Sequence, residues 1–178
     1  MSYPTEFFTA DDLHGLSVTT NEFTIVTADH ADGPHVHFQS LLARVRSGLG
    51  MDIAFVAEFV DGRRVFRHVD AEDDAMLTIE PGQSNALELT YCQRVVDGRL
   101  PLAIPDTGMN AEAAGLEVTQ ALEIASYLSA PIVLENGLVY GTLCCIGHQP
   151  HSELGEAQVQ ALRSVADLIA SSMKATVH

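Results

Sequence analysis

Two turn sequences, each between two apolar runs, constrain the fold of this chain more than any other feature. The first is Asp61-Gly62 and the second is Glu135-Asn136-Gly137. Such residues adopt the positive φ angles that tight hairpin turns need. The four flanking strands are expected at 51–60, 63–69, 126–134 and 138–146. A sheet built from hairpins is mostly antiparallel.

Apolar residues at helical spacing predict one long helix before the first hairpin and another after the second. A shorter helix is expected to follow Ser84 as its cap, and Asn110 is expected to cap a small helix that runs to about Ala121. Residues 102–104 read as a short strand. The two long helices are expected to pack together on one face of the sheet, and the middle helices on the other. This arrangement is an α/β (α+β) three-layer α/β/α sandwich.

Composition narrows the classes of partner. The 178 residues suffice for one domain, and 24 acidic against 9 basic residues give a net charge of −15. Nucleic acid and anionic membranes need a basic face, so neither is an expected partner. No secretory signal and no membrane-length apolar stretch is found, and three cysteines without a CxxC spacing suit a reducing compartment. A cytoplasmic location is therefore expected.

Two segments resemble a known family. Leu89–Pro101, with the sequence LTYCQRVVDGRLP, is similar to a stretch of bacterial GAF domains that accompany diguanylate cyclases, phosphodiesterases and other signalling modules. Ser126–Leu134 and Gly141–Cys145 resemble the two strands that GAF domains place at this spacing. The resemblance implies a GAF-like fold with a mostly antiparallel central sheet. It divides the chain into an N-terminal extension at 1–34 with a possible short helix, a GAF domain at 35–174 and a tail at 175–178.

The resemblance also implies a regulatory sensor domain. GAF domains bind a small molecule between the sheet and the middle helices, or pair through their terminal helices, and either event controls a signalling output. The known ligands of the family include cyclic nucleotides, haem, bilins, anions and small metabolites, and the sequence identifies no particular ligand or cofactor. A homodimer is expected to use the apolar stripes of the terminal helices: Phe38, Leu41, Leu42, Val45, Val159, Leu162, Val165 and Ile169.

Five residues are candidates for ligand binding. Arg99 and Asp106 lie on either side of the short strand, where polar groups often reach a pocket mouth. Tyr91 and Tyr127 could line the cavity, and Cys92 lies on a helix expected to border it. The alternative interpretation is structural: Asp106 caps a turn, and the tyrosines and Cys92 fill the core.

Two other functions stay open. One is a ligand-free dimerisation or interaction domain with a collapsed pocket. The other is a thiol-dependent enzyme, similar to methionine sulfoxide reductases, that uses Cys92. Cys144 and Cys145 are neighbours on a strand, so they should point to opposite faces and pack in the core. The sequence contains no recognised catalytic motif. His30, His35, His37 and His68 are candidate ligands for a metal or haem.

Overall fold

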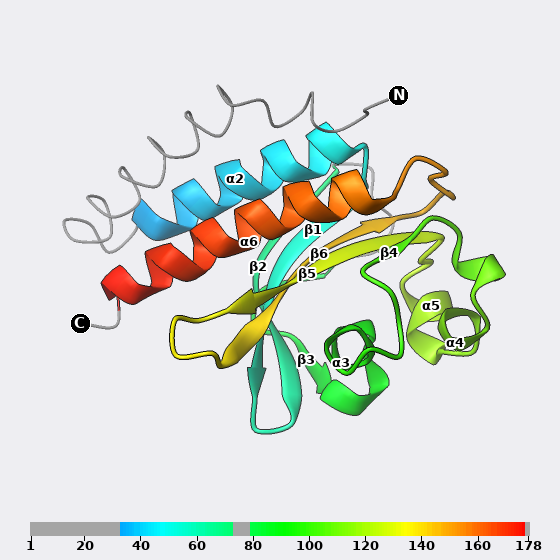
Figure 1. Ribbon diagram of the computed structural model, residues 1–178, viewed down its shortest axis with the longest axis horizontal. Helices are drawn as coiled ribbons and strands as arrows, with labels where there is room; N and C mark the ends of the chain where they lie inside the picture. The colour runs from blue at the N-terminus through cyan, green and yellow to red at the C-terminus, as the bar shows by residue number, and fades with distance from the viewer. Residues whose placement is uncertain (1–32, 73–78, 177–178) are drawn as a thin grey trace.

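The computed structural model describes residues 33–72 and 79–176 (Figure 1). The short helix predicted in the N-terminal extension lies outside this part of the chain. The helices are α2 (Gly33–Leu49), α3 (Tyr91–Val96), α4 (Ala111–Ala114), α5 (Glu117–Ala121) and α6 (Glu156–Thr176), with short 3-10 turns η1 (Leu87–Leu89) and η2 (Thr107–Met109). The strands are β1 (Ile53–Val60), β2 (Arg63–Ala71), β3 (Ser84–Ala86), β4 (Ala103–Ile104), β5 (Ser126–Val133) and β6 (Val139–Gly147).

The six strands form one sheet in the order β3-β2-β1-β6-β5-β4, and each neighbouring pair is antiparallel. Both predicted hairpins are confirmed. The first turns at Asp61 and Gly62, which have φ angles of 49° and 73°, and the second turns at Gly137, with a φ angle of 85°. The two hairpins meet where β1 pairs with β6 in the middle of the sheet.

Helices cover both faces of the sheet, so the predicted three-layer α/β/α sandwich is confirmed. Helices α2 and α6 lie side by side on one face, and α3, α4 and α5 lie on the other (Figure 1). Each interface holds its own hydrophobic core. The first core joins α2 and α6 to the sheet through residues such as Leu42, Val45, Leu162 and Val165. The second joins α3 and its neighbours to the sheet through Phe55, Tyr91 and Tyr127, among others.

Strand β6 supplies side chains to both cores. Cys144 belongs to the core on the α3 side and Cys145 to the core under α2 and α6, as the alternation of a strand requires. Gly141 marks where β6 and β1 approach closely, because a Cβ atom built there would lie 1.8 Å from the carbonyl oxygen of Ala57. Only glycine fits this position without displacing backbone.

The middle of the chain differs from the sequence prediction in two places. Ser84 begins β3 and pairs with Val65, so it is not a helix cap. The helix starts later, at Tyr91, where the side chain of Thr90 accepts a hydrogen bond from the amide of Gln93. Asn110 does cap α4, but in place of the predicted single helix α4 ends at Ala114 and a second helix, α5, begins at Glu117. Local hydropathy did not separate a three-residue edge strand from a helix start.

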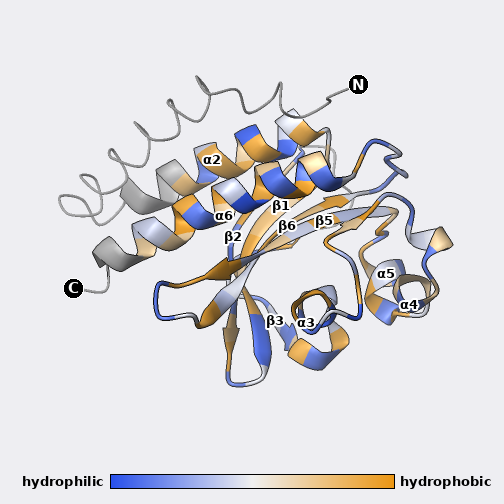
Figure 2. Cartoon of the chain, viewed as in Figure 1, coloured by the Kyte–Doolittle hydropathy of each residue, from blue (hydrophilic) through white to orange (hydrophobic). Residues whose placement is uncertain are grey.

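The apolar stripes of α2 and α6 are buried within the chain itself. All eight residues expected to form a dimer interface are at most 7% exposed in the first core. The outward-facing residues of α6 are polar: Glu156, Gln160, Arg163, Asp167 and Ser171. Hydrophilic and hydrophobic positions alternate along both helices (Figure 2). Within the two described segments, no helix is long and apolar enough to cross a membrane.

Candidate functional site

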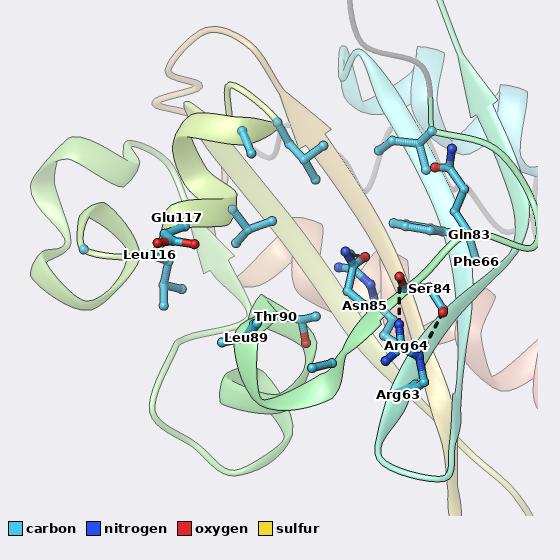
Figure 3. A pocket seen from close by; sticks show the side chains of 16 residues that line it. Arg63, Arg64, Phe66, Gln83, Ser84, Asn85, Leu89, Thr90, Leu116 and Glu117 are labelled. Carbon is cyan, nitrogen blue, oxygen red and sulfur yellow. Dashed lines mark hydrogen bonds between the residues drawn. The ribbon is translucent and has the colours of Figure 1, made fainter.

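A cavity of about 620 Å³ opens on the α3–α5 side of the sheet, between the β2–β3 edge and α5 (Figure 3). Pockets of this size accommodate metabolites and cofactors. The lining residues come from β2, the turn before β3, β3 itself, η1 and the α4–α5 region. They are Arg63, Arg64, Phe66, Ile79, Gln83, Ser84, Asn85, Ala86, Leu89, Thr90, Gly115, Leu116, Glu117, Val118, Ala121 and Leu122.

The two walls of the cavity differ in chemistry. Strands β2 and β3 present a polar wall with Arg63, Arg64, Ser84 and Asn85, and the α5 side presents mostly aliphatic side chains. Figure 3 shows the two arginines on the side away from Leu116 and Glu117. The cavity therefore has a cationic side and a largely apolar side.

Arg64 is the buried cation of the site, with only 3% of its surface exposed. Its Nη2 donates a hydrogen bond to Oδ1 of Asn85 at 2.7 Å, and its Nη1 lies 3.9 Å from Sγ of Cys92. Its Nε is buried and has no hydrogen-bond partner among residues 33–72 and 79–176. The guanidinium stacks over Phe66, with 4.4 Å from Cζ to the ring centroid. Cation–π contact with Phe66 and the bond to Asn85 hold the side chain in place.

Arg63 is the neighbouring cation and is exposed. Its Nε donates to Oγ of Ser84 at 3.0 Å, and its Nη2 donates to the carbonyl of Ser84 at 3.2 Å. These two bonds connect β2 to the short edge strand β3. Arg63 therefore shapes the rim of the cavity, whereas Arg64 supplies a charge from inside its wall.

A cluster of sulfur and hydroxyl groups lies behind Arg64. Sγ of Cys92 is 4.0 Å from Sγ of Cys144 and 3.2 Å from the hydroxyl of Thr142. The hydroxyl of Tyr127 lies 3.1 Å from Sγ of Cys144. All four side chains are fully or almost fully buried. Helix α3 and strands β5 and β6 thus bring together Cys92, Tyr127 and Cys144, which are far apart in sequence.

The pKa values of the groups in this cluster are shifted in opposite directions. The pKa of Cys92 lies below its ordinary value, because Cys144 hydrogen-bonds to its sulfur and the positive charge of Arg64 favours the thiolate. Burial raises the pKa of Cys144 well above its ordinary value, and the neighbouring Cys92 adds to the rise. Burial likewise raises the pKa of Tyr127. Cys92 is therefore the member of this cluster that carries negative charge most readily.

The structure places three of the five candidate residues together and two elsewhere. Tyr91, Cys92 and Tyr127 meet in the core behind the cavity wall, and the rings of Tyr91 and Tyr127 are 4.7 Å apart. Arg99 forms an exposed ion pair with Asp97 at 2.8 Å. Asp106 caps η2 by accepting a hydrogen bond from the amide of Gly108 at 2.9 Å. None of the five is among the cavity-lining residues.

Sequence reasoning missed Arg64. The segment 63–69 was interpreted from its apolar residues, and an arginine on a half-buried strand is normally read as facing solvent. A usable indication was present, because Arg64 and Phe66 are two residues apart and a strand places such residues on one face. Arg94, two residues after Cys92, forms an ion pair with Glu112 at 3.0 Å.

His68 and His148 do not line the cavity, and each contacts another residue outside it. His68 stacks on Phe38 with ring centroids 4.1 Å apart, on the α2 side of the sheet. Nδ1 of His148 lies 3.0 Å from the carbonyl of Glu123. His30 and the side chains of His35 and His37 lie outside the description. No group of three or more His, Cys, Asp or Glu side chains suited to a metal ion occurs in residues 33–72 and 79–176.

Comparison with known proteins identifies the same family as the sequence resemblance. The GAF domain model matches residues 34–173. No curated protein sequence matches the chain.

Solved structures share the fold at low identity. The phycoerythrobilin-bound GAF domain of a cyanobacterial phytochrome has a TM-score of 0.69 and 14% identity, over 91% of this chain and 96% of that one. Free methionine-R-sulfoxide reductase from Neisseria meningitidis, solved with its substrate, has a TM-score of 0.65 and 11% identity, over 91% and 90%. Bacteriophytochrome RpBphP3 from R. palustris has a TM-score of 0.68 and 15% identity; 94% of this chain aligns with 38% of that one.

Proposed function

The chain belongs to the GAF domain family, and from this membership and the cavity above we propose that it is a regulatory sensor domain that binds a small molecule. The observation that carries the proposal is the 620 Å³ cavity with the buried Arg64 in its wall. A ligand-free interaction domain needs no such space, so the open cavity favours ligand binding. Three free cysteines suit a reducing cytoplasm, where we propose that the domain acts on a bacterial signalling output.

Native mass spectrometry of the freshly purified protein, with an absorption spectrum, tests this proposal. We expect a bound mass, or one acquired from a metabolite mixture. Ala121 lines the cavity, and Ala121→Trp should displace that mass by filling the space. Ala114→Trp is the matched control, because Ala114 is exposed on α4 and does not line the cavity. A mass that survives in Ala121→Trp would mean that the molecule binds elsewhere.

We also propose that the domain forms a homodimer through α2 and α6. Because their apolar stripes are buried within the chain, pairing would use the polar outward residues and should be weak and concentration-dependent. Sedimentation equilibrium over a wide concentration range, with and without the bound molecule, measures it. A monomer at all concentrations in both states would exclude this part of the proposal.

One observation favours a second candidate function. The sulfur atoms of Cys92 and Cys144 are 4.0 Å apart, as a thiol-dependent reductase of free methionine sulfoxide would require of its cysteine pair. In that reaction the two thiols become a disulfide, the sulfoxide oxygen leaves as water, and dithiothreitol restores the thiols. Both thiols are fully buried and neither lines the cavity, so the sensor proposal is preferred.

The assay for the second candidate is methionine formation from free methionine R-sulfoxide in the presence of dithiothreitol. Activity should disappear in Cys92→Ser and persist in Cys145→Ser, because Cys145 packs in the other core. Wild-type protein that forms no methionine would eliminate the reductase.

A further inference from the structure

Within the described residues, Arg64 lacks a carboxylate partner, although the chain is rich in carboxylates. The chain has 24 acidic and 9 basic residues. Two other shielded arginines each contact a carboxylate: Arg46 contacts Asp70 at 2.6 Å, and Arg94 contacts Glu112 at 3.0 Å. Within residues 33–72 and 79–176, no carboxylate lies within 4.0 Å of Arg64, although Arg64 is only 3% exposed. A buried charge without a partner of opposite charge lowers the stability of the fold, so a buried arginine without a carboxylate is expected to have a partner of another kind.

Within the described residues, two of the five guanidinium N–H groups of Arg64 have a partner and three do not. Nη2 is bound to Asn85, Nη1 is directed to the sulfur of Cys92, and the buried Nε has no partner. The backbone of Arg64 is fixed on both sides, opposite Phe59 in β1 and Asn85 in β3. The guanidinium is thus held at the cavity wall before any ligand arrives, which reduces the ordering that binding requires.

The rest of the cavity limits what an anion there could be attached to. The wall on the α5 side is aliphatic, with Leu116, Val118 and Leu122, and Ile79 and Phe66 extend the apolar surface. Glu117 belongs to the same side as Leu116, away from the arginines (Figure 3). A carboxylate there would repel an anionic group and so favours its placement beside Arg64.

We propose that the cavity binds a small organic carboxylate with an apolar body, and that Arg64 is its anchor. One carboxylate oxygen accepts a hydrogen bond from the guanidinium of Arg64, which lines the cavity, and the apolar body lies against the α5 wall. Asn85 and Phe66 position the guanidinium, and the acidic surface elsewhere disfavours non-specific anion binding. The proposal deepens the proposed function and rests on it, because it names the chemical class of ligand for the same cavity.

The alternative source of negative charge is the thiolate of Cys92. Its sulfur lies 3.9 Å from Nη1, but Cys92 does not line the cavity, whereas Arg64 does. A ligand carboxylate would give Arg64 a partner from the cavity side. The two explanations predict different results for Cys92→Ser. If the thiolate is the partner of Arg64, the cavity should select anions only after the sulfur is removed. If a ligand carboxylate is the partner, the wild-type protein should already select them.

Calorimetric titration with 2-naphthoate and its neutral isostere 2-naphthamide tests the proposal. Because hydrogen bonds to charged groups contribute about 1.5–3 kcal/mol, wild-type protein should bind 2-naphthoate at least about tenfold more tightly than the amide. Arg64→Gln should lose this preference. Arg163→Gln, which removes the same charge from an exposed site on α6, should keep it. Circular dichroism confirms that each variant is folded.

Every other result overturns the proposal. Equal affinity for the two probes would show a cavity that does not select anions, and the proposed sensor function would stand. Persistence of the preference in Arg64→Gln would remove Arg64 as the anchor. A preference that appears only in Cys92→Ser would assign the thiolate as its partner. Failure of both probes at millimolar concentration would also reject the carboxylate class, while native mass spectrometry judges the sensor function independently.

Discussion

Replacing Arg64 with methionine should leave the free energy of unfolding unchanged or increase it. The buried guanidinium loses its hydration on folding, an effective cost of several kcal/mol. Against this stand a cation–π contact of about 2 kcal/mol with Phe66 and a charged hydrogen bond of about 1.5–3 kcal/mol to Asn85. These contributions roughly cancel. Methionine fills a similar volume without a charge, so we expect a change between about 0 and +2 kcal/mol.

Asn85 is exposed, so water replaces the bond that the substitution removes, and little penalty is added. Urea denaturation followed by circular dichroism gives the free energy of unfolding from the midpoint and slope. Arg46→Met is the control, because Arg46 contacts Asp70 at 2.6 Å and both side chains are 14% exposed. Breaking this pair should destabilise the fold by about 2–3 kcal/mol, below the range for fully buried pairs.

A loss of more than about 1 kcal/mol in Arg64→Met would refute the reasoning, since it would mean that the contacts of Arg64 outweigh its desolvation. It would also weaken the case for a missing anion. An unchanged or increased stability, with 2-naphthoate selectivity lost, would show that Arg64 is kept for binding rather than for folding.

Three further predictions concern the thiols and the sheet. Burial raises the pKa of Cys145 to about 12, so as the pH rises this thiol ionises in the unfolded chain before it does in the folded one. The free energy of unfolding should therefore fall between about pH 9 and pH 12. Cys145→Ala should make this fall smaller in urea titrations at several pH values. Diamide should join Cys92 to Cys144, whose sulfurs are 4.0 Å apart, and peptide mapping that finds Cys144 bonded to Cys145 would contradict the geometry. Gly141→Ala should destabilise the domain by about 3 kcal/mol, because its Cβ would lie 1.8 Å from the carbonyl oxygen of Ala57. Gly155→Ala is the control and should change the thermal midpoint little, because its Cβ would lie 3.7 Å from Oε1 of Gln158.

The layers of the fold could be predicted because they depend on local patterns. The turns at Asp61-Gly62 and at Gly137 have the expected positive φ angles, and the apolar spacing of Leu42, Val45 and Leu162 places these residues in one core. The placement of Cys144 and Cys145 follows from strand alternation alone. Each of these inferences needs only residues close together in the sequence.

The cavity could not be predicted in the same way because it depends on contacts between distant segments. Cys92 and Cys144 are brought together by the packing of α3 on β6, which no local pattern specifies. Arg64 pairs with the edge strand β3 and donates a hydrogen bond to Asn85 of that strand. The local pattern of the β3 segment predicted the start of a helix, so this neighbour of Arg64 was not expected. Arg99 and Asp106 were chosen for their place beside a short strand, but each contacts a neighbour in its own turn.

Strand β6 lies between the two hydrophobic cores, and its own side chains enter both of them. Cys144 contacts the group of residues behind the cavity, and Cys145, joined to it by one planar peptide unit, is packed beneath α2 and α6. A displacement of the strand on the cavity side must therefore tilt that peptide and move a side chain in the opposite core. Closely packed interiors resist such a movement unless the covering helices adjust. In the proposed sensor, strand β6 would therefore be the shortest connection between the α3 side of the sheet and the outer helices.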